Sequence, residues 1–248
     1  DSNRNPVPLF IRDPQKTGNC SATDQTACFP GNVVPANRIN KNGQALLNVF
    51  PLPNATNLSI TNANYNYLFQ ESIKVPKRQN LFRTDYRPSA KDSFYVRGSL
   101  WYADNQGIAV PAGTANWGLA GLHYTFTDNS ITGNWTHVLS PRLVNEASIG
   151  VRHSVEKGPP LNDTALGKLQ KATYGYTLGQ FYPQLNPLGI IPSVSFGNIT
   201  NPANITYDER TPLRGADTLI TFTDNITYMF NSHTLKAGFY AERARNYE

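Results

Sequence analysis

The chain contains 248 residues and carries a net charge of +5, with 16% charged and 11% aromatic residues. Its 13 Tyr and 12 Phe, together with abundant Thr and Asn, suit strands joined by loops. Glu and Lys, which long helices favour, are scarce. The composition therefore excludes a helical bundle and disfavours a doubly wound α/β enzyme.

The 22 Lys and Arg residues are spread along the chain, whereas a nucleic-acid reader would cluster them on one face. We therefore expect no nucleic-acid partner. No stretch reaches the roughly 18 consecutive apolar residues of a membrane-spanning helix. Because the chain opens in a loop-like stretch and stops inside a patterned segment, we expect it to be a piece of a larger protein.

Residues 1–79 are punctuated by Pro and Asn and show little strand periodicity. One short helix is predicted within residues 40–50, where Asn40 can cap its start and Pro51 can end it. The remainder of this first domain is predicted to be a long surface loop.

The two cysteines, Cys20 and Cys28, lie in one stretch rich in Ser, Thr and Asp. With no other Cys and no nearby His, they make a poor zinc site. A local disulfide is the favoured interpretation, and it would indicate an oxidising compartment. The alternative is a pair of unrelated free thiols.

From residue 80 to residue 248 the pattern alternates with period two, which is typical of strands with one apolar and one polar face. Three hairpins with short turns are predicted, and their strands cover residues 80–87, 93–102, 123–139, 143–152, 218–230 and 235–242. A Gly- and Ala-rich connection at 104–121 follows the first hairpin. A long loop rich in Pro, Gly and Asn covers about residues 154–216.

Short turns at one end, long loops at the other and aromatic residues near the strand ends are typical of outer-membrane β-barrels. A closed barrel also pairs every backbone N–H and C=O group inside hydrocarbon. About eight strands is the smallest usual number, so six need further neighbours. The predicted fold is an all-β, antiparallel transmembrane barrel segment of the bacterial outer membrane, with long extracellular loops.

Alternation along the strands predicts two sets of residues on opposite faces. The apolar set is expected to face lipid: Phe82, Phe94, Leu100, Ile149, Phe222 and Phe239. The polar set is expected to face the barrel lumen: Arg83, Asp85, Arg87, Arg97, Glu146 and Arg152. The polar set either contacts a plug or a polar substrate, or is simply a solvated wall. In a soluble all-β adhesion or glycan-binding protein, the alternative class, the apolar set would instead form the core.

Several segments, in order along nearly the whole chain, resemble one family. In the first loop they are Ile11–Pro14 (IRDP), Phe29–Ile39 (FPGNVVPANRI), Ala45–Leu47 (ALL) and Phe50–Asn54 (FPLPN). In the predicted hairpins they are Asp85–Tyr86, Lys91–Ser93, Trp135–Glu146 (WTHVLSPRLVNE), Asp224–Thr227 and His233–Gly238 (HTLKAG). These strings are similar to those of Oar-like TonB-dependent outer-membrane receptors.

The resemblance implies an outer-membrane barrel of about 22 strands with an internal plug, driven by TonB and the proton-motive force. Such a receptor moves a large ligand, here of unknown identity, and contacts TonB through a plug that residues 1–248 do not contain. Two features depart from the family pattern: the stretch with Cys20 and Cys28, and Asn231 where Gly is commoner. A passive porin would lack the plug.

No catalytic set is evident, and we expect neither an enzyme nor a bound cofactor or metal. The four histidines are far apart in sequence, and His137 and His233 adjoin predicted turns. Ser195 lacks the Gly-x-Ser-x-Gly pattern of a nucleophile elbow. The chain also has no glycine-rich phosphate loop. The long loops at 1–79 and 154–216 are the expected ligand-capturing surface, because external loops carry recognition on such scaffolds.

Overall fold

The structure is a computed structural model that describes residues 10–62, 64–111, 113–115, 117–197 and 202–247. The chain forms two compact units. The sheet unit comprises residues 71–166 and 206–248, and the loop unit comprises residues 1–70 and 167–205.

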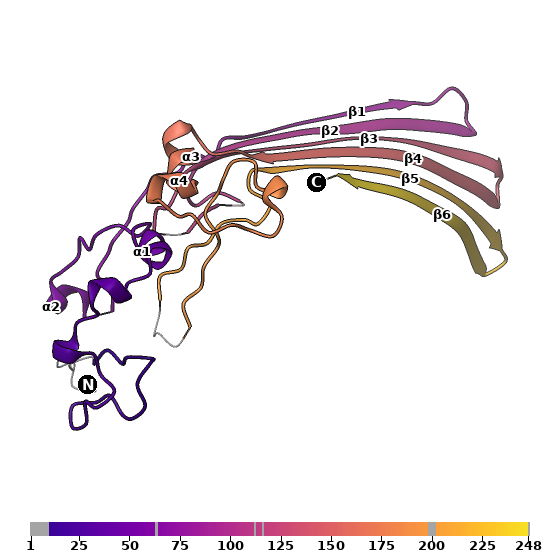
Figure 1. Cartoon of the computed structure of the whole chain (residues 1–248). Helices are drawn as coiled ribbons and strands as arrows, with labels where there is room; N and C mark the ends of the chain where they lie inside the picture. The colour runs from indigo at the N-terminus through magenta and orange to yellow at the C-terminus, as the bar shows by residue number, and fades with distance from the viewer. Residues whose placement is uncertain (1–9, 63, 112, 116, 198–201, 248) are drawn as a thin grey trace. The chain divides into compact units, whose positions relative to one another are not determined.

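Six strands form one antiparallel sheet, in which each strand pairs with its neighbours in sequence (Figure 1). They are β1 (Lys77–Tyr86), β2 (Asp92–Gly107), β3 (Leu122–Ser140), β4 (Leu143–Gly158), β5 (Leu213–Phe230) and β6 (His233–Tyr247). β1 and β6 lie at the two edges, so this sheet is open. The predicted all-β class and antiparallel hairpin order are confirmed.

The turns within the three hairpins are short, as the sequence predicts. β3 and β4 are joined by Pro141 and Arg142, and β5 and β6 by Asn231 and Ser232. Asn231 has a φ of 51°, in the left-handed region that tight hairpin turns require and that Asn tolerates. This conformation explains how Asn can stand where the resembled family more often has Gly.

Ser89 organises the turn between β1 and β2. Its Oγ accepts hydrogen bonds from the backbone N–H groups of Lys91 (3.1 Å) and Asp92 (3.0 Å) and donates one to the Asp92 carboxylate (2.7 Å). One hydroxyl thereby satisfies several polar groups of the tight connection.

The cross-strand register determines which side chains share a face, because directly opposed residues point the same way. One row runs across five strands through Phe94, Trp135, Ala147, Asp224 and Phe239. Within the paired residues, the register shifts only between Val138 and Ser140, beside the β3–β4 turn. Each strand therefore presents the same two faces along almost its whole length.

Buried residues of the sheet unit gather at the loop-bearing end of the strands. Leu122, Tyr124, Leu213 and Val110 form a cluster there, against which Phe126 packs. Elsewhere many large apolar side chains of the strands remain exposed. The described strands all belong to one sheet, so no second sheet covers the apolar face as a soluble sandwich would require.

The loop unit contains short helices between irregular segments. They include α1 (Lys41–Leu47), α2 (Leu58–Thr61) and α4 (Lys171–Tyr174), with single 3₁₀ turns at Pro30–Asn32, Ala36–Arg38 and Pro183–Leu185. α3 (Asp163–Leu169) runs from the sheet unit into the loop unit. No helix among the described residues is both long enough and apolar enough to cross a membrane.

The sequence predicts only one helix in residues 1–79, and α1 lies where it is expected. The Asn40 side chain caps α1 by accepting hydrogen bonds from the backbone N–H groups of Asn42 (2.9 Å) and Gly43 (3.1 Å). α2 is a second helix that the prediction missed, because a single turn of four residues leaves too short a pattern to recognise.

Replacing Asn231 tests the hairpin conformation. Asn231→Val should hinder formation of the β5–β6 hairpin, since a β-branched residue is strained at positive φ and a non-glycine residue there costs about 1–2 kcal/mol. Asn231→Gly should assemble at least as well as the wild type. The folded fraction of the full-length protein can be followed by its mobility on unheated electrophoresis gels, and equal folding of both variants would contradict the turn assignment.

Candidate functional site

The polar face of the sheet carries five of the six residues expected to face the lumen. Arg83 opposes Arg97 across β1 and β2, Asp85 opposes Tyr95, and Glu146 and Arg152 occupy the same face of β4. Arg87 lies just beyond the end of β1, in the turn, and has no register position. The five residues that lie in strands therefore share one face, as the alternation predicts, whereas Arg87 lies outside the strands.

Most charges on this face are paired with one another. The Arg83 guanidinium binds the Asp85 carboxylate at 2.7 Å and lies 4.2 Å from the centroid of the Tyr95 ring. Arg152 binds Asp128 through two nitrogens, at 2.8 and 2.9 Å. Exposed pairs of this kind add little stability, but together they make a polar surface with little uncompensated charge.

The apolar face carries all six residues expected to face lipid. They lie in β1, β2, β4, β5 and β6, and the register places them on one side: Phe82, Phe94, Leu100, Ile149, Phe222 and Phe239. Their exposed fractions range from 37% to 62%. A contiguous apolar surface of this extent is unusual on a soluble monomer and marks a face that another apolar medium covers.

Aromatic side chains pack along this face toward the turn end. Phe94 stacks on Trp135 with ring centroids 5.9 Å apart, and Phe222 packs on Phe239 at 6.5 Å. The Trp135 indole N–H donates to the Asp92 carboxylate at 3.1 Å, and the same oxygen lies 2.7 Å from His137 Nδ1. Rings that are apolar on one side and hydrogen-bonded at one end are typical of the boundary between hydrocarbon and water.

The histidines do not converge on a metal or catalytic site. His123 lies 2.7 Å from Asp104, His137 is bound to Asp92, and His153 lies 2.9 Å from the Thr218 hydroxyl. No group of three His, Cys, Asp or Glu side chains suited to a metal occurs in the described part of the chain.

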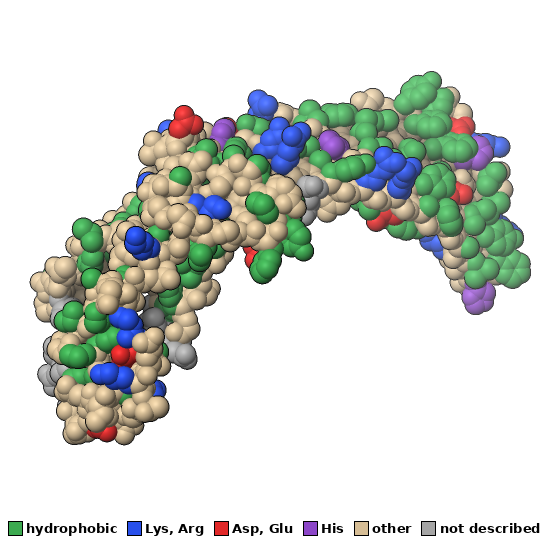
Figure 2. Space-filling model, in the orientation of Figure 1, with side chains coloured by type: hydrophobic (Ala, Val, Ile, Leu, Met, Phe, Trp, Pro, Cys, Tyr) green, Lys and Arg blue, Asp and Glu red, His purple; other side chains and the backbone are tan. Residues whose placement is uncertain are grey.

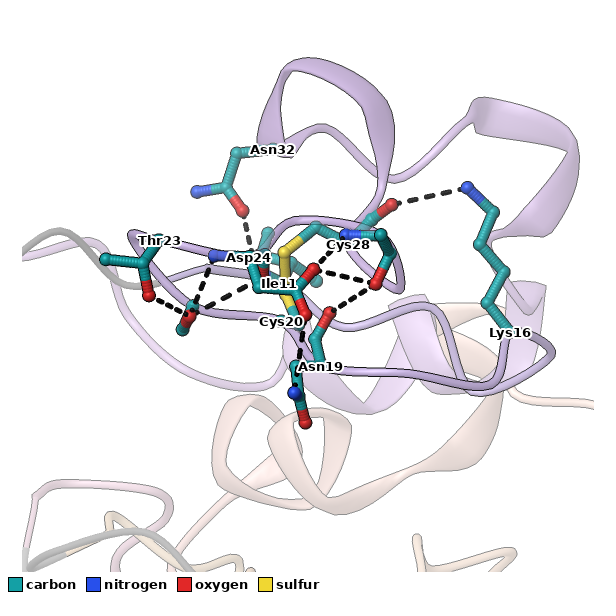
Figure 3. The surroundings of a disulfide bond; sticks show 10 residues. Ile11, Lys16, Asn19, Cys20, Thr23, Asp24, Cys28 and Asn32 are labelled. Carbon is teal, nitrogen blue, oxygen red and sulfur yellow. Dashed lines mark hydrogen bonds between the residues drawn. A yellow bond between two sulfur atoms is a disulfide. The ribbon is translucent and has the colours of Figure 1, made fainter.

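A disulfide joins Cys20 to Cys28 in the loop unit (Figure 3). Inside this ring Asp24 accepts hydrogen bonds from the Thr26 backbone N–H (3.1 Å) and hydroxyl (2.8 Å). The Lys16 ammonium donates to the Cys28 carbonyl at 3.4 Å. The ring is therefore held by polar contacts as well as by the covalent bond.

An ion pair lies beside this ring and was not evident from the sequence. The buried Asp13 carboxylate accepts from Arg38 at 2.9 Å and from the Gln15 backbone N–H at 3.0 Å. Arg38 also lies 5.3 Å from the centroid of the Phe29 ring. The hydrogen bond from Arg38, followed by that from Gln15, holds the pKa of Asp13 below its ordinary value. A separation of 25 residues gave no local signal for the pairing.

The two long segments expected to capture ligand meet within the loop unit. The Asn42 side chain accepts a hydrogen bond of 2.7 Å from the Thr177 backbone N–H and a second from its hydroxyl, across 135 residues of sequence. The Phe50 and Phe196 rings pack with centroids 5.9 Å apart. The two long loop segments, which are far apart in sequence, therefore contact each other and form one structured surface.

A single antiparallel sheet with one uncovered apolar face, one polar face and short turns defines a segment of a membrane β-barrel. Comparison with family models agrees, because the model described as an outer membrane beta barrel domain matches residues 2–248. The chain belongs to this family and is a protein of the bacterial outer membrane. No curated protein and no solved structure matches it.

Substitution of neighbouring residues in β2 tests the assignment of the two faces. Leu100→Arg should block membrane assembly of the full-length protein, because Arg facing lipid near the bilayer centre costs roughly 2–4 kcal/mol. Ser99→Arg introduces the same side chain one position away, on the opposite face, and should assemble normally. The amount of folded protein in outer-membrane fractions measures both, and normal assembly of Leu100→Arg would disprove the lipid assignment.

Acidification tests the ion pair of the loop unit. Because the folded pKa of Asp13 is lowered, its contribution to stability is present above the unfolded pKa of about 3.9 and is lost as pH falls through the folded pKa. Hydrogen exchange of residues 10–40, corrected for intrinsic rates, should rise on acidification from neutral pH. The increase should be smaller in Arg38→Gln, which lacks the main cause of the shift.

Arg12→Gln is the matched control for this experiment, because it removes a nearby positive charge that does not contact Asp13. Its exchange should retain the pH dependence of the wild type. An unchanged pH dependence in Arg38→Gln would show that Asp13 does not stabilise this segment through Arg38.

Proposed function

We propose that this chain is part of the barrel of a TonB-dependent outer-membrane receptor that moves a large ligand across the membrane without covalent chemistry. The proposal joins the family assignment to the resemblance with Oar-like receptors. The sheet supplies the wall of the barrel, and the loop unit supplies the surface that captures the ligand. TonB acts through a plug that this chain does not contain.

The observation that carries the proposal is a contact between two of the resembling segments. Asp13 belongs to the IRDP string, and it binds Arg38 of the FPGNVVPANRI string, which also lies over Phe29. Two segments that are separate in sequence therefore contact each other in the structure. This is expected if they are the shared framework of one kind of receptor loop.

The composition of the loop unit supports capture of a large ligand. Phe181 is 97% exposed and Tyr182 is 64% exposed. Nearby, Gln180 accepts hydrogen bonds from Lys171 and Asn186, so the backbone that carries these rings is anchored. Exposed rings on an anchored loop can bind a partner with little loss of conformational freedom.

A passive porin is the main competing function within the same family of folds. The polar face, with its paired Arg83 and Arg152, would suit either a water-filled lumen or a wall in contact with a plug. The loop unit favours the receptor, because its two long segments are joined to each other and build an extended surface. A soluble adhesin is disfavoured, because the apolar face has no covering sheet among the described strands.

Conductance and TonB binding together test the proposal. The full-length protein, reconstituted in planar lipid bilayers, should show no steady ion current, since a plug blocks the lumen, and it should bind the purified periplasmic domain of TonB. A steady open-channel current together with no TonB binding would identify a porin. An outer-membrane protein from the same cells that conducts openly serves as the control for reconstitution.

A further inference from the structure

A hollow opens on the polar face of the sheet, near the loop-bearing end of β2 and β3. Six of its lining residues belong to these two strands: Trp101, Ala103, Asn105, Tyr124, Phe126 and Asp128. We call it the β2–β3 hollow. Its volume of about 330 Å³ falls within the roughly 300–1,000 Å³ of pockets that hold a small ligand. Hydrophobic side chains gather over the turn ends of the strands (Figure 2), so the hollow lies away from that apolar surface.

The register explains why a hollow forms at this place. Trp101, Ala103 and Asn105 alternate along β2, so all three side chains point to the polar face. Ala103 lies directly opposite Phe126 of β3 and Lys77 of β1. A single methyl group among larger side chains leaves a space that those side chains enclose. The hollow therefore exists because the residue at its base is small.

Three aromatic rings line the β2–β3 hollow, and two of them are held in place. The Tyr124 hydroxyl donates a hydrogen bond of 2.9 Å to the Glu156 carboxylate, which fixes the direction of the ring. Phe126 packs against the buried cluster that contains Tyr124. The Trp101 ring is half-buried and lines the hollow from β2. Rings that are already fixed bind a partner with little loss of conformational freedom.

Asn105 brings an unused hydrogen-bond acceptor to the hollow. The residue is only 5% exposed, and among the described residues its side-chain oxygen has no hydrogen-bond partner. It lies directly opposite Tyr124, so the amide and the ring point to the same face. Native structures rarely leave a buried polar atom without a partner, because such an atom has lost its water and gained nothing in return. A donor group of a ligand would complete this site.

The charges of the lining favour a neutral ligand. Lys77 and Asp128 are the charged residues of the lining, so their formal charges cancel. Two nitrogens of Arg152 already bind the Asp128 carboxylate, at 2.8 and 2.9 Å, and hold it in one orientation. A carboxylate has further lone pairs that accept hydrogen bonds from hydroxyl groups. Neutral O–H donors therefore suit both Asp128 and the Asn105 oxygen.

We propose that the β2–β3 hollow is a subsite for one neutral sugar ring of an oligosaccharide. The face of an aromatic ring is negatively polarised and attracts the weakly positive C–H groups on the flat side of a sugar. Asp128 lies directly opposite Trp101, so a ring and a carboxylate flank the same space. A sugar stacked on Trp101 donates one hydroxyl to Asn105 and another to Asp128. The hollow thus selects a molecule with an apolar face and hydroxyl groups at its edge.

The subsite names the chemistry of the ligand in the proposed transport function, and it rests on that function for the role of the bound sugar. Binding itself requires only that the polar face lines the barrel lumen, and it involves no contact with TonB. Absence of sugar binding would leave TonB binding and conductance unchanged. Absence of TonB binding would leave sugar binding by the purified protein unchanged.

The test measures sugar binding to the full-length protein by isothermal titration calorimetry, in an amine-oxide detergent that has no sugar headgroup. The probes are linear neutral hexasaccharides of glucose, mannose, galactose and xylose, compared with the anionic hexamer of galacturonic acid. Ala103→Leu fills the hollow, and Asn105→Leu removes the unused acceptor. The matched control is Ser99→Leu, which places the same side chain on the same face of β2 but outside the lining.

The wild type should bind at least one of the neutral hexasaccharides. Ala103→Leu should abolish that binding, and Asn105→Leu should weaken it about tenfold, the effect of losing one hydrogen bond to a buried group. Ser99→Leu should bind like the wild type. Asn105→Leu should also assemble at least as well as the wild type on unheated electrophoresis gels, because it replaces a buried, unpaired acceptor with an apolar side chain. Its loss of binding is then not caused by misfolding.

Three results would overturn the proposal. Failure of the wild type to bind any of the four neutral hexasaccharides would show that the hollow takes no sugar. Equal weakening in Ser99→Leu would place the binding outside the hollow. Tighter binding of the galacturonic acid hexamer than of every neutral probe would show that charge selects the ligand, in place of the aromatic ring and the hydroxyl contacts.

Discussion

Backbone pairing from β1 to β6 holds each strand in one register, and the side chains of a strand alternate strictly between two faces. A slip of one residue in any strand would move its whole apolar set to the polar side. The register keeps Phe82, Leu100 and Phe239 on one face and Arg83 and Arg152 on the other. The covering of each face by lipid or by a polar medium depends on this alignment.

The chain handles charge differently on the two faces. On the polar face Arg83 and Arg152 lie within hydrogen-bonding distance of the carboxylates of Asp85 and Asp128. On the apolar face Lys157 and Arg214 oppose each other without a carboxylate among the described residues. Ion pairs within the sheet therefore compensate Arg83 and Arg152 on the polar face, whereas none among the described residues compensates Lys157 and Arg214 on the apolar face.

The hairpins could be predicted from the sequence because alternation and turn residues are local signals. The strand ends near the long loops could not, since β2 continues past the predicted Tyr102 to Gly107. There Ala103 and Asn105 are buried, and in β3 Leu122 and Tyr124 are buried as well. At this end the buried residues still alternate, but they lie on the face that is polar further along the strands, so a pattern followed along one apolar face ends before the strand does.

The contacts that build the candidate site were beyond the reach of sequence patterns for a related reason. Asp13 and Arg38 are 25 residues apart, and Asn42 and Thr177 are 135 residues apart. Lys157 and Arg214 become neighbours only when β4 and β5 pair across the long loop between them. The disulfide was predictable because both cysteines lie in one short stretch.

The open edges of the sheet connect these observations to the membrane. β1 and β6 each present a row of backbone groups without a strand partner in the described sheet. In water such an edge is tolerable, but in hydrocarbon every unpaired N–H and C=O group costs several kcal/mol. The apolar face favours lipid, but the backbone groups of the two edges cannot remain unpaired there. Both conditions are met if further strands continue the sheet on both sides. The six strands are thus part of the wall of a larger barrel. Arg243 and Arg245 lie on β6, one of the two edge strands at which that wall continues.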